Sequence, residues 1–214
     1  MIGLELWDNL FQLFVTLLGG LYAMHLYRRS GKRSLAFLSA AQLSWALGLV
    51  YWSLYLSLRG YTPPEPNAAN IAWSGGFLFF VAVAQWLTTP EERRYRPRLA
   101  LLAPLLTLPF TVLWFVWGSD KSIGINLIWG AGMMWVSWHY FRGYLLFRMK
   151  GRKAYARFHL IVLLMLLFDE MVMLYPLLLN PFDYFRFNGY YFFDILTTLM
   201  LALQVPALKR AEGA

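Results

Sequence analysis

Hydrophobic residues occur along this chain in seven long runs that are separated by short polar links. The runs cover residues 5–27, 34–58, 69–88, 98–118, 121–146, 155–179 and 187–208. About 20 apolar residues in a helix are enough to cross the hydrocarbon core of a bilayer. The pattern therefore predicts an all-α membrane protein with seven transmembrane helices in a single domain, residues 1–214.

The positive charges of the links predict the orientation. Of the 19 Lys and Arg residues, only Arg59, Lys121 and Arg186 lie in links on one side. The others lie in the links after the first, third and fifth runs or at the end of the seventh. Because Lys and Arg are enriched in cytoplasmic loops, we expect the N-terminus outside, the C-terminus in the cytoplasm, and a multi-pass protein of the inner or plasma membrane.

Composition removes several classes of protein. The chain is 59% hydrophobic and has no cysteine, which excludes disulfide frameworks and thiolate metal sites. The net charge of +8 does not indicate nucleic acid as a partner, because the basic residues gather on the side that topology requires. The first charges are Glu5 and Asp8 rather than basic residues, so we expect the first run to be a retained helix and not a signal peptide.

A faint internal repeat relates residues 1–90 to residues 120–210, with residues 98–118 as a linker helix. In each half, a helix that runs outward is followed by a polar outer link and a helix that returns. The prediction is a parallel repeat of three helices, one helix and three helices, an arrangement that organises some transporters. Similar hydrophobicity alone also produces such matches, and the sequence leaves both interpretations open.

Three carboxylic acids, Asp169, Glu170 and Asp194, lie inside the last two hydrophobic runs. An ionised acid at mid-bilayer costs on the order of 3 kcal/mol, and no Lys or Arg of the chain is expected at that depth. These acids must be protonated, hydrogen-bonded, open to a water-filled cavity or paired with a group from outside the chain. Asp169 and Glu170 are adjacent, so they point about 100° apart on a helix and cannot both face one partner.

Polar and aromatic residues in the outer halves of other helices could complete a pocket around these acids. Aromatic faces beside a carboxylate suit an organic cation. The alternatives are that Trp and Tyr form the interfacial belt and that the acids are structural hydrogen-bonding groups. The further candidates for ligand binding are Asp8, Asn9, Gln12, Trp52, Trp73, Asn126, Trp129, Tyr190 and Tyr191.

Neither a metal nor a cofactor is expected. His25, His139 and His159 lie towards the predicted cytoplasmic helix ends, and none has a second histidine at ligand spacing. We interpret them as residues that face headgroups and loops. A retinal protein needs a lysine within its seventh helix, and here Lys209 stands at the end of that run. No hydrolase, zinc-protease or nucleotide-binding motif is present, so we expect no enzyme.

The second and third runs carry the most specific sequence pattern. Trp45, Gly48 and Trp52 lead into a link with Gly60 and Pro63, and the next helix opens with Ala69-Asn70-Ile-Ala-Trp73. This resembles the seven-helix membrane region at the N-terminus of bacterial diguanylate cyclases and sensor histidine kinases. Asn70 stands where that pattern often has Asp.

The last two runs resemble the corresponding pair of that family, with Asp169 and Asp194 at its acid-bearing positions. The 214 residues include no cyclase or kinase domain, so the resemblance implies a sensory or coupling module without enzymatic activity. We therefore expect a module that binds a small hydrophobic or cationic ligand, or protons, in an outer-half pocket and signals to a cytoplasmic partner. A small-solute transporter coupled to protons or cations and an accessory subunit of a membrane complex are the alternatives.

Overall fold

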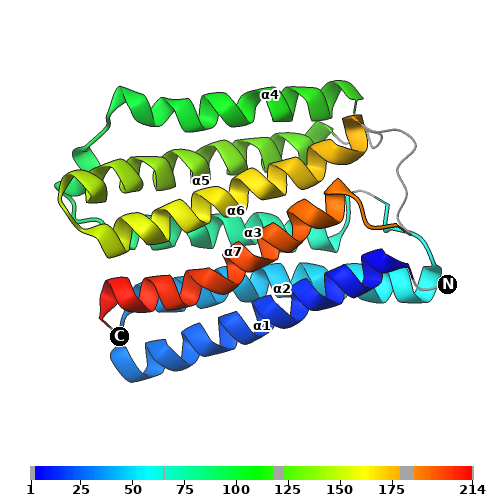
Figure 1. Ribbon diagram of the computed structural model, residues 1–214, viewed down its shortest axis with the longest axis horizontal. Helices are drawn as coiled ribbons and strands as arrows, with labels where there is room; N and C mark the ends of the chain where they lie inside the picture. The colour runs from blue at the N-terminus through cyan, green and yellow to red at the C-terminus, as the bar shows by residue number, and fades with distance from the viewer. Residues whose placement is uncertain (1–2, 65, 118–122, 179–185, 214) are drawn as a thin grey trace.

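The computed structural model confirms the all-helical class. It describes residues 3–64, 66–117, 123–178 and 186–213. Lys121 and the predicted run ends at 118, 121 and 179 lie outside these residues. Within them, each hydrophobic run contains one long helix (Figure 1): α1 (Leu4–Ser30), α2 (Arg33–Arg59), α3 (Ala68–Trp86), α4 (Leu102–Trp117), α5 (Ile123–Met149), α6 (Lys153–Leu178) and α7 (Gly189–Glu212). Two short 3-10 helices, η1 (Glu92–Arg94) and η2 (Arg98–Leu101), precede α4.

Within the described residues, five helices are long and apolar enough to cross a membrane, namely α1, α2, α3, α6 and α7. The chain is therefore a helical membrane protein. Helix α4 has only 16 residues, and α5 carries Asn126, His139 and Arg142 among its apolar residues. The crossing of the membrane by all seven helices, the orientation and the internal repeat remain predictions.

Six helices form a closed ring in the order α1, α2, α3, α5, α6, α7, and α7 returns to pack on α1. Helix α4 lies outside this ring against α5 and α6, at the upper edge of the bundle in Figure 1. The two groups of three helices, α1–α3 and α5–α7, therefore surround one common interior. This arrangement positions the candidate site.

Small residues let the ring helices approach closely. Ser39 on α2 donates a hydrogen bond of 2.8 Å to the carbonyl oxygen of Gly20 on α1. Gly48 leaves space for the Trp73 indole, because a Cβ at Gly48 would lie only 2.7 Å from Trp73 Cδ1. The core between the helices is apolar and aromatic, with Leu38, Phe77, Phe80, Met133, Tyr140, Phe158 and Leu201 all buried.

The end of the bundle that holds the C-terminus and the links after α1, α3 and α5 is here called the basic end. Glu92 of η1 ties two of these links together, because its carboxylate lies 2.8 Å from Lys150 Nζ and 3.4 Å from Arg152 Nη1. Burial disfavours the charged form of Glu92, but the hydrogen bonds from Lys150 and Thr89 and the positive charges around it prevail. The pKa of Glu92 is therefore lowered from its ordinary value of 4.5.

Candidate functional site

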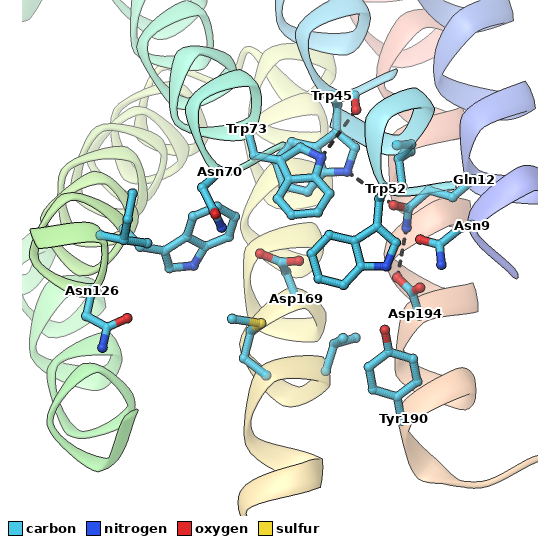
Figure 2. Close-up of a pocket in the computed structure, with 15 residues that line it drawn as sticks. Asn9, Gln12, Trp45, Trp52, Asn70, Trp73, Asn126, Asp169, Tyr190 and Asp194 are labelled. Atoms are coloured by element: carbon cyan, nitrogen blue, oxygen red, sulfur yellow. Dashed lines mark hydrogen bonds between the residues drawn. The ribbon is translucent and has the colours of Figure 1, made fainter. Parts of the chain in front are cut away.

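A cavity of about 120 Å³, here called the central cavity, lies inside the ring of six helices. It lies towards the end opposite the basic end, where α1 and α7 begin (Figures 1 and 2). Every ring helix contributes to it, and α4 contributes none of the described side chains that line it. The lining residues are Asn9, Gln12, Trp45, Leu49, Trp52, Asn70, Trp73, Ile125, Asn126, Trp129, Asp169, Val172, Met173, Tyr190 and Asp194.

The lining residues of each helix are spaced so that they share one face. Residues three or four positions apart lie one above the other on an α-helix. Such spacings recur at Asn9 and Gln12, at Asn126 and Trp129, and at Tyr190 and Asp194. The lining residues of six separate helices therefore converge on the same interior space.

Trp73 stands at the centre of an aromatic cluster that covers one side of the cavity (Figure 2). Its ring centroid lies 5.6 Å from that of Trp52, 6.3 Å from that of Trp45 and 6.1 Å from that of Trp129. The Trp73 indole N–H donates to the carbonyl oxygen of Trp45 at 3.3 Å, which fixes the ring between α2 and α3. Gly48 makes this placement possible.

Asp194 is held by a hydrogen-bonded network. Gln12 Nε2 donates to Asp194 Oδ1 at 2.8 Å and to Thr198 Oγ1 at 3.0 Å. The other side-chain atom of this amide, Gln12 Oε1, accepts the indole N–H of Trp45 at 3.2 Å. The Asp8 carboxyl lies within hydrogen-bonding reach of Asp194, so Asp8 adjoins the site although it does not line the cavity.

Asp169 differs from Asp194 because one of its oxygens has no partner. The residue is only 8% exposed, and Asp169 Oδ2 makes no hydrogen bond within the part of the chain that the structure describes. No Lys or Arg is among the described residues that line the cavity. The cavity therefore offers two acids and several aromatic faces without a basic residue to neutralise them, and this combination suits a small cation.

Two of the predicted site residues lie away from the central cavity. Glu170 does not line the central cavity but a smaller, adjoining cavity of about 20 Å³, which also includes Thr111 of α4. The two cavities share Asn126, Trp129 and Met173 in their walls. Tyr191 is buried, with a ring centroid 5.1 Å from that of Tyr190, and is not a lining residue. Each of them directly follows a residue that lines the central cavity, Asp169 or Tyr190. Residues adjacent in a helix point about 100° apart, so the second residue of each pair points to a different face.

Sequence reasoning did not include Trp45 and Asn70 among the ligand-binding candidates. Trp45 precedes Trp52 by seven residues, two helical turns, and this spacing could have indicated that the two rings share a face. Asn70 also has a structural role, since its Oδ1 accepts the backbone N–H of Asn67 at 2.9 Å at the start of α3. Glu5 was missed as well, although it accepts the indole N–H of Trp52 at 3.1 Å.

The interpretation of the histidines as residues that face headgroups and loops is wrong for His159, which is buried with 0% exposed surface. His25 is exposed, and His139 is 7% exposed but lines a cavity with Arg93 and Arg96 of the link after α3. His159 fits between α5 and α6 because Gly143 has no side chain there, and its Nδ1 lies 2.8 Å from the carbonyl oxygen of Tyr155. Across the described residues, no three His, Asp or Glu side chains form a group that could hold a metal ion.

Comparison with protein-family models, with curated proteins and with solved structures finds no match to this chain. The resemblance to the membrane regions of cyclases and kinases therefore stays an expectation from the sequence. The chemistry of the central cavity is the basis for a proposal about function.

Proposed function

We propose that this protein is a membrane-embedded sensory module that binds a small organic cation in the central cavity. One observation supports this most directly: Asp169 is buried in an apolar helix beside a group of Trp rings, and one of its oxygens has no partner among the described residues. A buried acid without a partner is costly. A ligand cation would supply the missing positive charge, and the faces of Trp73 and its neighbours would add cation–π attraction.

The size of the cavity limits the ligand. Its volume is about 120 Å³, and an apolar protein cavity of about 150 Å³ accepts a molecule as large as benzene. A ligand with only a few heavy atoms fits, such as a methylated or other small alkyl ammonium ion. The amides of Asn9 and Gln12 offer polar contacts to a ligand that also carries a hydroxyl group.

Binding in this cavity would bias the arrangement of the helices. A ligand shifts an equilibrium only through its different affinities for two states, and here it would contact all six ring helices at once. A change in their packing would reach the basic end through the helices themselves. The links after α3 and α5, which Glu92 joins, are the surface that a cytoplasmic signalling partner would read in the predicted orientation.

The test uses tetramethylammonium chloride as the probe and the full chain in neutral detergent or nanodiscs. We expect the probe to change Trp fluorescence and to raise the melting temperature, while sodium chloride at the same concentration does neither. Asp169→Asn should weaken the apparent affinity at least about tenfold, because it removes the charge that attracts the probe, and two unit charges about 4 Å apart attract by about 4 kcal/mol at an effective dielectric constant of about 20.

Glu170→Gln is the matched control, since it removes the neighbouring acid, which lines the other cavity. It should leave the apparent affinity unchanged. Equal responses to the two salts in the wild-type protein would reject a cation site. An equal loss in Asp169→Asn and Glu170→Gln would show that general charge, and not the central cavity, causes the response.

The arrangement of the helices favours a transporter as a second candidate. The cavity lies between the two groups of three helices, and α4 lies outside them, as expected for a carrier built from two halves. Uptake of radiolabelled tetramethylammonium into proteoliposomes separates the two functions. A transporter accumulates the probe in proportion to a cation or proton gradient, whereas a sensor binds it without uptake.

A further inference from the structure

A second and larger cavity lies at the basic end, and the central cavity does not include any of its residues. It has a volume of about 330 Å³ and is lined by Gln85 of α3, Arg93 and Arg96 of the following link, and Trp138, His139 and Arg142 of α5. Among the described lining residues there are three arginines and no carboxylate. We propose that this cavity binds the phosphate group of an anionic phospholipid.

The most deeply buried arginine of this cavity, Arg142, is held by hydrogen bonds to the backbone. Arg142 is 2% exposed, and its Nη1 is directed at the carbonyl oxygens of Glu92, Arg93 and Tyr95, at 3.2, 3.2 and 3.4 Å. These bonds hold the guanidinium in place and use only one of its three nitrogens. Arg142 Nε is buried and has no partner in the described part of the chain.

His139 provides a second unsatisfied group in the same cavity. It is 7% exposed, and its Nδ1 is buried without a hydrogen-bond partner among the described residues. Trp135 and Trp138 contact the imidazole, with ring centroids at 6.0 and 4.8 Å. A phosphate oxygen that accepts from Arg142 and His139 would satisfy groups that have no hydrogen-bond partner among the described residues.

The charges around the cavity also favour an anion. Arg142 is close enough to Arg93 and Arg96 for mutual repulsion, and Glu92 is the opposing charge. The Glu92 carboxylate is already shared by Lys150 and Arg152. Arg93 and Arg96 are exposed at the mouth of the cavity. Among the described residues, the three guanidinium groups around this cavity therefore have no carboxylate of their own.

The position in the membrane points to a lipid as the source of the phosphate. The cavity lies towards the basic end of α3 and α5, which the predicted orientation places at the cytoplasmic headgroups, and the neighbouring Trp135 is 45% exposed. Basic pockets between transmembrane helices on the cytoplasmic side are a known type of anionic headgroup site. Bound lipid would fix the link after α3 against α5.

The experiment measures the melting temperature of the full chain in neutral detergent against three probes: dihexanoyl-phosphatidylglycerol, dihexanoyl-phosphatidylcholine and sodium phosphate. We expect stabilisation by phosphatidylglycerol and none by phosphatidylcholine. Arg96→Gln should weaken the apparent affinity for phosphatidylglycerol about fivefold, the effect of one arginine near an anionic headgroup. His139→Gln should also weaken it and serves as an independent variant within the same cavity.

Arg94→Gln is the matched control, because Arg94 is an exposed arginine of the same link that does not line the cavity. The apparent affinity of the Arg94→Gln variant for phosphatidylglycerol should equal that of the wild type. A shift with sodium phosphate that Arg96→Gln abolishes would support the site with free phosphate as its ligand. Equal stabilisation by the two lipids without any effect of phosphate, or an equal loss in Arg94→Gln and Arg96→Gln, would overturn the proposal.

Discussion

Gln12 on α1 donates a hydrogen bond of 2.8 Å to Asp194 on α7, so the first and last helices of the ring are joined inside the membrane domain. The same amide accepts the indole N–H of Trp45 and therefore connects α2 as well. One side chain links three helices at the edge of the central cavity. It both closes the ring and orients one of the acids.

Replacing Gln12 with Leu should destabilise the fold. The change leaves the Trp45 indole N–H and the Asp194 carboxyl without this partner, and a buried unpaired polar group costs about 1–3 kcal/mol. Thermal unfolding in detergent measures the loss. In an Asp194→Leu background, the further cost of Gln12→Leu should be smaller, because one of its bonds no longer exists. Fully additive losses would contradict the coupling of the two residues.

Gly48→Ala should disturb the aromatic side of the cavity. The new Cβ would meet the Trp73 ring at 2.7 Å from Cδ1, so the indole has to move. Overpacking of this kind typically costs about 1–3 kcal/mol. A lower melting temperature and a shifted Trp emission spectrum are the expected results.

Gly75→Ala in α3 provides the control for Gly48→Ala. At Gly75 the nearest heavy atom to a new Cβ, Ser44 Oγ, is 3.9 Å away, an ordinary contact. The alanine should be neutral or slightly stabilising, because Ala favours the helix over Gly. Equal destabilisation by the two substitutions would show that the space beside Trp73 is not what Gly48 provides.

Glu92 should make stability depend on pH at the acidic end of the range. The pKa of Glu92 is lowered in the folded protein from 4.5, so the folded state favours the ionised acid. Its contribution is complete above the ordinary pKa of 4.5 and is lost as the pH falls through the lower folded value. Glu92→Gln should therefore lower the free energy of unfolding at neutral pH by up to about 1 kcal/mol.

The difference between Glu92→Gln and the wild type should disappear at a pH below the folded pKa, and melting curves from pH 7 to 3 measure it. Lys150→Gln removes the other partner of the ion pair and should reduce the dependence of stability on pH in the same range. A pH-independent difference between Glu92→Gln and the wild type would contradict an origin in the charge of Glu92.

The orientation can be tested because the chain contains no cysteine. Thr62→Cys places a thiol in the exposed link between α2 and α3, and Glu91→Cys places one between α3 and α4. The distribution of Lys and Arg predicts that a membrane-impermeant maleimide labels position 62 in intact cells and position 91 only after permeabilisation. The reverse pattern would contradict the predicted topology.

The seven hydrophobic runs could be recognised in the sequence because length and apolar content are local properties. Each run corresponds to a helix in the described residues, with ends within a few residues of the expected ones. The separation of Asp169 from Glu170 was also predictable, since the helical period alone directs adjacent side chains to different faces. The structure places them in different cavities.

The tertiary structure decided which faces meet. The hydrogen bond between Gln12 and Asp194 joins residues 182 positions apart, and no periodicity within one helix encodes such a contact. The same holds for the cavity at the basic end, where Arg96 of a link and Arg142 of α5 come together. In the sequence, the charges of these two arginines indicated only on which side of the membrane they lie.

The sequence by itself thus determined the helices, their apolar character and the presence of acids without basic partners, because each depends on residues close together in the chain. The order of the helices around the ring, the position of α4 outside it and the polar groups that surround each cavity were decided by packing. The physical reason is that these features depend on the close approach of side chains from helices that are distant in the sequence, as Gly48 and Trp73 illustrate.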